Sequence, residues 1–208
     1  MWSVYLDPNP VNVAATRALG AISRRAYFGP LAPLRARQIK VPALPDARWV
    51  RVRNTVTGIS SADVAAVLLR RDAPLAVNAL PHQRRHYLGR EVCGEVVEVG
   101  PEVQFLRRGD RVAYQLDQCC ATLEIEPPCR HCATGNDSLC ANRYSYASEQ
   151  QAIGGGWGDE IVAHERQFFL VPDKLTDEQA ALLEPSAAAV HAAMRHQPHN
   201  SCSRSKQL

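Results

Sequence analysis

The sequence has no long apolar run and no long run of charge of one sign. Its apolar stretches are shorter than the roughly 18 residues that a membrane-spanning helix needs, so we expect no contact with a membrane. The formal net charge is only +3, and the basic residues occur as short pairs such as Arg70-Arg71, with no aromatic residues between them. Nucleic-acid sites combine a basic patch with side chains that stack on bases. Nucleic-acid binding is therefore not expected.

The chain also lacks a secretory start, and its number of cysteines is odd. Residues 1–20 contain no basic start followed by an apolar run and a small-residue cleavage site. The seven cysteines cannot all pair with one another as disulfides. We therefore expect a protein of a reducing compartment, the cytoplasm, whose cysteines are free thiols or metal ligands.

Four of the cysteines stand in a C-x8-C-x2-C-x7-C run, which predicts a structural zinc site. They are Cys120, Cys129, Cys132 and Cys140. Zn²⁺ favours four thiolates in a tetrahedron, and a C-x2-C pair within one loop surrounds the ion with little loss of chain entropy. Disulfides and buried thiols are the alternatives, but the prolines and polar residues between these cysteines favour a loop over a core strand. Cys119 stands beside Cys120 and is an alternative ligand.

The hydrophobic pattern predicts a domain that is mainly β with short helices. We expect strands from residue 48 and over 92–99, 111–114, 160–164 and 168–171, which favours a barrel-like β domain. In the first of these strands apolar and polar residues alternate, and Arg51 is expected on the polar face. Thr176 and Gln179 form a capping box before a helix, and a break at Glu184-Pro185 precedes a second helix from Ser186 to about Arg195.

The two ends of the chain give weaker patterns. Residues 1–45 are expected to be a lead segment with a short amphipathic helix over 13–25 and a proline-punctuated loop. Residues 46–195 are expected to form the domain. Residues 196–208 are polar without periodicity and are expected to be disordered.

Three further segments follow one another in the order of known motifs. Residues 58–63 read Gly-Ile-Ser-Ser-Ala-Asp, residues 89–94 read Gly-Arg-Glu-Val-Cys-Gly with Gly100 following, and residues 183–185 read Leu-Glu-Pro. They resemble the G-I-C-G-[ST]-D, G-H-E-x2-G-x5-G and E-P motifs of the zinc-containing medium-chain alcohol dehydrogenases. The cysteine run resembles that family's structural-zinc lobe with a widened first gap. The resemblance implies a GroES-like, partly open β-barrel over roughly residues 46–195, which in the family precedes a nucleotide-binding domain.

The chain departs from this family where the catalytic zinc is bound. In the family, the Cys and His of the first two motifs ligate that zinc, and a Ser or Thr passes on the proton of the alcohol. The matching residues here are Ser60, Arg90 and Ala62. A neutral hydroxyl is a poor zinc ligand, and a guanidinium repels a dication. The resemblance therefore implies an oxidoreductase whose catalytic site is degenerate.

Three acidic positions of the catalytic site remain. Asp63, which in the family orients the ligand His, has no imidazole to hold at residue 90. Glu91 and Glu184 match positions that in parts of the family touch the metal, and Arg90 is able to bridge them as a guanidinium. The alternative is that these are ordinary surface charges. His86 is a weaker candidate to replace the missing imidazole.

The resemblance also implies NAD(P), but no segment of this sequence provides its site. The glycine-rich residues 154–158 follow a polar loop and lead into a strand, unlike a G-x-G-x-x-G turn that opens a helix. We therefore expect a truncated, catalytically impaired, zinc-binding oxidoreductase domain that binds neither NAD nor NADP. A second copy or another partner is expected to cover its C-terminal helices. The alternatives are a zinc-stabilised interaction module, or a zinc-independent reductase relative that uses the nucleotide domain of another chain.

Overall fold

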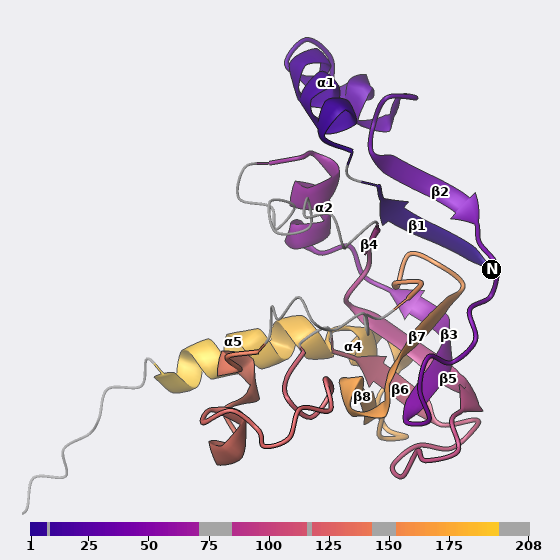
Figure 1. The fold of residues 1–208 in the computed structure, drawn as a ribbon, viewed down its shortest axis with the longest axis vertical. Coiled ribbons are helices and arrows are strands. Elements are labelled where there is room, and N and C mark those ends of the chain that lie inside the picture. Colours follow the sequence, from indigo (N-terminus) through magenta and orange to yellow (C-terminus); the bar gives the residue numbers. More distant parts are fainter. Residues whose placement is uncertain (8, 71–84, 116–117, 143–152, 196–208) are drawn as a thin grey trace, which may run out of the picture.

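The computed structural model describes residues 1–7, 9–70, 85–115, 118–142 and 153–195 (Figure 1). The strands are β1 (Trp2–Leu6), β2 (Leu34–Gln38), β3 (Trp49–Thr57), β4 (His86–Tyr87), β5 (Val92–Val99), β6 (Arg111–Tyr114), β7 (Glu160–His164) and β8 (Phe168–Leu170). The α-helices are α1 (Pro10–Gly20), α2 (Ser61–Val67), α4 (Asp177–Ala181) and α5 (Leu183–Arg195). Short 3-10 helices are η1 (Arg24–Phe28), η2 (Cys132–Thr134), η3 (Asp137–Leu139) and η4 (Glu165–Gln167). The expected disordered tail, residues 196–208, lies outside the described residues.

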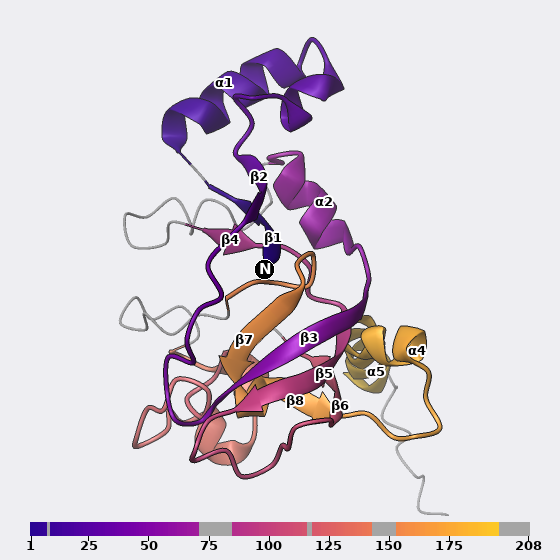
Figure 2. The same cartoon turned by 90° about the vertical axis from the view of Figure 1, so that its right-hand side faces the viewer.

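The main sheet is antiparallel, with the strand order β7-β3-β5-β6-β8. Figure 2 shows that it curls into a half-barrel. These are the five strands that the hydrophobic pattern predicts, so the expected mainly β, barrel-like architecture is confirmed. Valines, one isoleucine and aromatic residues of the main sheet form the largest core cluster, around Trp49, Val96 and Ile161. In the part of the chain that the structure describes, no helix combines the length and apolar composition needed to cross a membrane.

Arg51 of β3 shows a limit of the alternating pattern. It was predicted on the polar side of the strand, yet the residue is only 7% exposed. Its guanidinium donates to Glu98 (Nε to Oε2, 2.7 Å) and to the carbonyl oxygen of Pro42 (2.7 Å), and also pairs with Glu160. A buried guanidinium is tolerated because its donors are satisfied in this way.

The N-terminal segment is more structured than expected. Strands β1, β2 and β4 form a second sheet in the order β2-β1-β4, and none of the three was predicted. Helix α1 begins earlier than expected because the side chain of Asn9 accepts a hydrogen bond from the N–H of Val11 (2.9 Å) and Pro10 suits the first turn. Tyr5 of β1 pairs with Tyr87 of β4, which joins residues 1–45 to the domain that follows.

The first C-terminal helix begins as predicted, but the second begins at Leu183, before the expected Ser186. The capping box of Thr176 and Gln179 opens α4, with reciprocal hydrogen bonds of 3.0 and 3.3 Å. The break falls at Leu182 and not at Glu184-Pro185, because Pro185 lies in the first turn of α5, where a backbone N–H has no helical partner. Helix α4 packs its alanines against Cys93 of β5, and α5 leads away from the sheet (Figure 1).

A buried carboxylate fixes the loop before β6 to the main sheet. The side chain of Glu165 is fully buried and accepts hydrogen bonds from the N–H groups of Gln104 (2.8 Å) and Phe105 (2.9 Å) and from Arg48 (3.0 Å). Burial raises the pKa of Glu165, but the two N–H donors and Arg48 together lower it more, so the net pKa lies below its ordinary 4.5.

We expect Glu165→Gln to lower the free energy of unfolding by about 2 kcal/mol at pH 7, because charge-assisted hydrogen bonds are lost. The stabilisation by this carboxylate is present above the unfolded pKa of 4.5 and is lost as the pH falls through the lower folded pKa. The difference from the unmodified chain should therefore shrink below pH 4.5. Urea denaturation across this pH range measures it. The exposed Glu102, changed to Gln, is the control, and a pH-independent difference for Glu165→Gln would contradict the prediction.

Candidate functional site

The four cysteines of the run come together in the loop between β6 and β7. Their sulfur atoms all lie within 4.8 Å of one another. Cys120 and Cys140 are buried, and the other two are half-buried. Cys119 is outside this group, and its N–H instead donates to the hydroxyl of Thr122 (2.9 Å). The six described cysteines are free thiols. The geometry therefore offers four sulfur ligands to one ion.

The loop directs N–H groups at these sulfurs. The N–H of Cys129 donates to the Sγ of Cys120 (3.3 Å), and the N–H of Ala141 donates to the Sγ of Cys129 (3.5 Å). Asn142 donates twice, from its N–H to the Sγ of Cys140 (3.4 Å) and from its side-chain amide to the Sγ of Cys120 (3.3 Å). Such donors stabilise thiolates and orient metal ligands. The sequence pattern did not identify Asn142; its place two residues after a cysteine of the run is the only signal.

The acidity of the thiols depends on these contacts. The N–H groups of Cys132 and Ala141 lower the pKa of the Cys129 thiol to about 6. Burial raises the pKa of the Cys132 and Cys140 thiols. Thiolates packed this closely repel one another unless a cation lies between them. The donor set, soft and partly ionised, therefore fits Zn²⁺.

Ser60 and Asp63 are used to start helix α2. The hydroxyl of Ser60 accepts the N–H of Asp63 (3.1 Å), and the N–H of Ser60 donates to the Oδ2 of Asp63 (3.2 Å), which makes a capping box. The same hydroxyl also donates to this carboxylate oxygen (2.6 Å). The other oxygen of Asp63 accepts the N–H of Gly89 (3.1 Å). Both side chains are buried. Asp63 therefore ties the helix to the turn before Arg90, and the Ser60 hydroxyl is occupied as a cap.

Arg90 pairs with Glu184 and not with Glu91. Its Nη2 donates to the Oε1 of Glu184, which lies in the first turn of α5, and the two side chains are 29% and 22% exposed. The side chain of Glu91 lies against Gly58, where an added Cβ would meet its carboxylate. Gly89 has φ +85°, a conformation that favours glycine, and this turn places Arg90 beyond β4. The guanidinium therefore links the turn between β4 and β5 to α5.

Ala62 and His86, the remaining candidate positions, belong to no group of metal-type ligands among the described residues. Ala62 is half-buried in the first turn of α2. The pKa of His86 is lowered, mainly by burial. The charge of Asp63 raises this pKa and that of Arg90 lowers it, so His86 lies within electrostatic reach of Asp63 and Arg90. In the part of the chain that the structure describes, the cysteine cluster is the one group of three or more metal-type ligands. A hydroxyl used as a cap and an ion-paired guanidinium do not fit a zinc ion.

The glycine-rich turn before β7 does not fit a dinucleotide. Gly154 and Gly155 have φ of +108° and +65°. An added Cβ at either would come within 2.4 Å of a carbonyl oxygen, so the turn is already packed against the protein. The side-chain amide of Asn54 donates to the carbonyls of Gly155 (3.1 Å) and Gly158 (2.7 Å). The turn leads into a strand and provides no helix N-terminus for a pyrophosphate.

Comparison with known proteins agrees with this architecture. Residues 46–173 match the alcohol dehydrogenase GroES-like domain. The chain is 35% identical to D-arabitol-phosphate dehydrogenase of Enterococcus avium over 105 residues, which is 50% of this chain and 28% of that protein. It is 29% identical to sorbitol dehydrogenase of Bacillus subtilis (strain 168) over 163 residues, 76% of this chain and 42% of that protein.

Solved structures support the same fold. Galactitol-1-phosphate dehydrogenase from Escherichia coli superposes with a TM-score of 0.62 at 23% identity, over 92% of this chain and 44% of that one. At this identity the likeness shows the fold alone. The chain spans less than half the length of these relatives. With the family domain matched over more than half of the sequence, the chain belongs to the alcohol dehydrogenase family through its GroES-like domain.

Proposed function

We propose that this chain is a zinc-type alcohol dehydrogenase-like oxidoreductase domain that keeps a single structural zinc and is impaired at the catalytic-zinc position. The cluster of four sulfurs within 4.8 Å of one another supports the first part. Cys120, Cys129, Cys132 and Cys140 would hold the ion, which would keep the loop between β6 and β7 in place. A closed four-sulfur site has no open position for a substrate.

The ion pair of Arg90 and Glu184 is the observation that carries the second part. Arg90 supplies a positive charge where the family has a zinc ligand, and it neutralises Glu184. A guanidinium stays protonated and has no vacant orbital with which to polarise an alcohol oxygen. Ala62 has no hydroxyl to pass on a proton, and Ser60 caps α2. As it stands, this chain binds zinc without oxidising an alcohol.

If an active form of this domain exists, its substrate class is best proposed from the relatives. The names of the two matched enzymes include sorbitol and D-arabitol phosphate, so a polyol or its phosphate is the first class to test. The family implies NAD(P), and the packed turn at residues 154–158 gives it no support in this chain. A nucleotide-binding domain from another chain would then be required for turnover.

We expect the purified chain neither to bind NAD or NADP nor to reduce them with sorbitol. Calorimetric titration with each cofactor and absorbance at the nicotinamide wavelength measure this, with sorbitol dehydrogenase of Bacillus subtilis as the positive control. Cofactor reduction would overturn the proposed impairment. Cofactor binding without reduction would show that this chain itself holds a nucleotide, which none of the proposed functions expects.

A non-catalytic, zinc-stabilised interaction module is the second candidate. Exposed apolar side chains on the last helix favour it: Val190 is 57% exposed and Met194 is 70% exposed. A second copy of the chain or another protein would cover this face. Cofactor reduction that appears only when a chain with a nucleotide-binding domain is added would favour the reductase relative over this module.

A further inference from the structure

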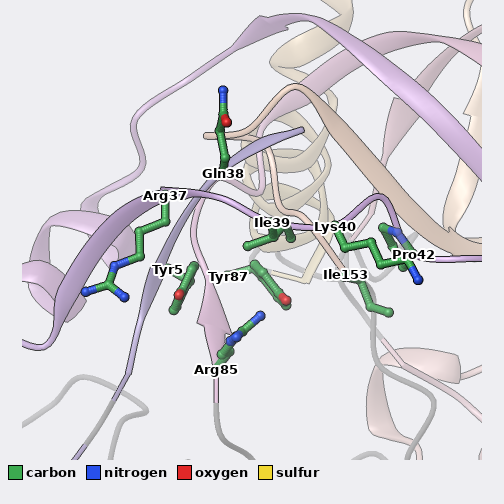
Figure 3. Close-up of a pocket in the computed structure, with 9 residues that line it drawn as sticks. All are labelled: Tyr5, Arg37, Gln38, Ile39, Lys40, Pro42, Arg85, Tyr87 and Ile153. Atoms are coloured by element: carbon green, nitrogen blue, oxygen red, sulfur yellow. The ribbon is translucent and has the colours of Figure 1, made fainter.

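The pocket beside the N-terminal sheet does not gather its charges at one point. It has a volume of about 530 Å³ and is lined by residues of β1, β2 and β4 and of the segment after β2 (Figure 3). Arg37 points away from Arg85 with Tyr5 between them, and Lys40 lies on the far side. Polar groups that do converge on one place are found around the cysteine cluster, in the loop between β6 and β7.

Asn142 connects the two ends of the cysteine run. Its N–H donates to the Sγ of Cys140 (3.4 Å), and its side-chain amide donates to the Sγ of Cys120 (3.3 Å). These two sulfurs are 3.7 Å apart, although the residues are 20 positions apart in the chain. One residue, two positions after the last cysteine, therefore holds the first and last cysteines of the run against each other.

The two sulfurs that Asn142 contacts are the least accessible of the four. Cys120 is 1% exposed and Cys140 is 7% exposed, while Cys129 and Cys132 are half-buried. Four thiolates carry more negative charge than one Zn²⁺ neutralises, and hydrogen-bond donors stabilise the excess. Water reaches the half-buried sulfurs more easily than the buried ones. For Cys120 and Cys140 the donors must therefore come from the protein, and Asn142 supplies one to each.

The amide of Asn142 differs in kind from the other donors described above. The N–H groups of Cys129 and Ala141 belong to the backbone, so they remain when a side chain is changed. The Nδ2 of Asn142 belongs to a side chain and faces the sulfur of Cys120. A carboxylate in its place would repel an ionised sulfur. The identity of residue 142 therefore affects how well the loop accommodates thiolates.

From these contacts we infer that Asn142 is a positioning residue for the zinc, which sets the spacing of Cys120 and Cys140 and stabilises their thiolates. Its polar atoms contact the sulfurs, so it acts on the ion through them. The ion is the structural zinc proposed above, on which this inference rests.

Asn142→Ala should weaken zinc binding by about tenfold or more, as expected for the loss of a hydrogen bond to a metal ligand. Asn142→Asp has nearly the shape of asparagine and should weaken it at least as much, because a carboxylate then faces the Cys120 thiolate. Both variants keep the backbone N–H that donates to Cys140. Competition with a chromophoric chelator under reducing conditions measures the affinity, and circular dichroism of each variant checks the fold.

Co²⁺ in place of zinc tests whether the amide acts on the sulfur itself. A thiolate that loses a hydrogen bond gives up electron density more readily. The thiolate-to-cobalt absorption should therefore move to longer wavelength in Asn142→Ala. If Asn142 only packed the loop, zinc binding would weaken while this absorption stayed in place, and that result would overturn the inference.

Asn136→Ala is the matched control. Asn136 is exposed in the same loop, and its side-chain amide donates to the hydroxyl of Thr134 (3.1 Å). This change should alter the zinc affinity by less than about twofold and leave the cobalt absorption in place. Equal weakening in Asn136→Ala would show a general loosening of the loop and would overturn the role of Asn142.

Two outcomes separate this role from the zinc site itself. If the unmodified chain holds zinc and Asn142→Ala binds it as tightly, the role of Asn142 is rejected and the proposed zinc site stands. If the unmodified chain takes up neither zinc nor Co²⁺, the proposed zinc site is wrong, and the role of Asn142 is rejected with it.

Discussion

Cys129→Ser is expected to release the zinc of the purified chain, from about one ion to near zero per chain after dialysis. A structural zinc held by thiolates contributes about 10–16 kcal/mol of apparent binding free energy in small domains, and a neutral serine hydroxyl does not replace a thiolate. The N–H groups of Cys132 and Ala141 would then face a hydroxyl that does not ionise. Elemental analysis under reducing conditions measures the loss.

The loop between β6 and β7 should open when the metal is lost. Arg130 is exposed between Cys129 and Cys132, so trypsin should cleave after it faster in the variant. Losing several kcal/mol of metal-linked stability should also lower the melting temperature by more than about 5 °C.

The neighbouring cysteine provides the control for this experiment. Cys119 is buried beside the cluster but is not one of its four members. Cys119→Ser should keep about one zinc per chain. Zinc loss in Cys119→Ser with retention in Cys129→Ser would reverse the ligand assignment. Two zinc ions in the unmodified chain would show that the catalytic position also binds metal.

The second large effect is expected at Arg90. Arg90→His alone should lower the free energy of unfolding by about 1 kcal/mol near pH 8, because Glu184 loses its partner in a partly exposed ion pair. At that pH the new imidazole is neutral and does not replace the charge. Arg108→His, at an exposed arginine outside the pair, should be neutral within about 0.5 kcal/mol.

The double variant Ser60→Cys, Arg90→His should instead become more stable when zinc is added. The double variant loses the cap of α2, which costs about 1 kcal/mol without metal. It gains a thiol at residue 60 and an imidazole at residue 90, the two positions that match the family's zinc ligands, so a second zinc should bind there with Glu184. At a zinc concentration about a hundredfold above the dissociation constant, this adds about 2.7 kcal/mol. Thermal unfolding with and without zinc, together with metal content, measures both effects.

Turnover should remain absent in the double variant, because Ala62 has no hydroxyl. A neutral Arg90→His together with a double variant that binds no second metal would mean that Arg90 is an ordinary surface charge. If Arg90→His loses stability but the double variant binds no second zinc, the ion pair has a structural role. The proposed geometry of the catalytic-zinc position would then be wrong.

The local sequence determined those parts of this protein that depend on residues near one another in the chain. Alternating valines predicted β3 and β5, turn residues bounded β6 and β7, and Thr176 with Gln179 located the start of α4. The spacing of the cysteines identified a group whose sulfurs the structure brings together. Each of these signals acts over one strand, one helical turn or one loop, where backbone geometry leaves few alternatives.

Contacts between distant residues were decided by the tertiary structure. Strands β1, β2 and β4 gave no clear pattern, because β4 has only His86–Tyr87 and pairs with a strand about eighty residues away. The burial of Arg51 depends on Glu98, Glu160 and Pro42, which no alternation rule contains. The membership of Cys120, and not Cys119, follows from the path of the loop.

The same division applies to the charged sites. The motifs showed that Arg90 stands at a ligand position, but the sequence left both Glu91 and Glu184 as possible partners. The structure pairs Arg90 with Glu184, because the turn at Gly89 and the first turn of α5 bring them together while Glu91 packs on Gly58.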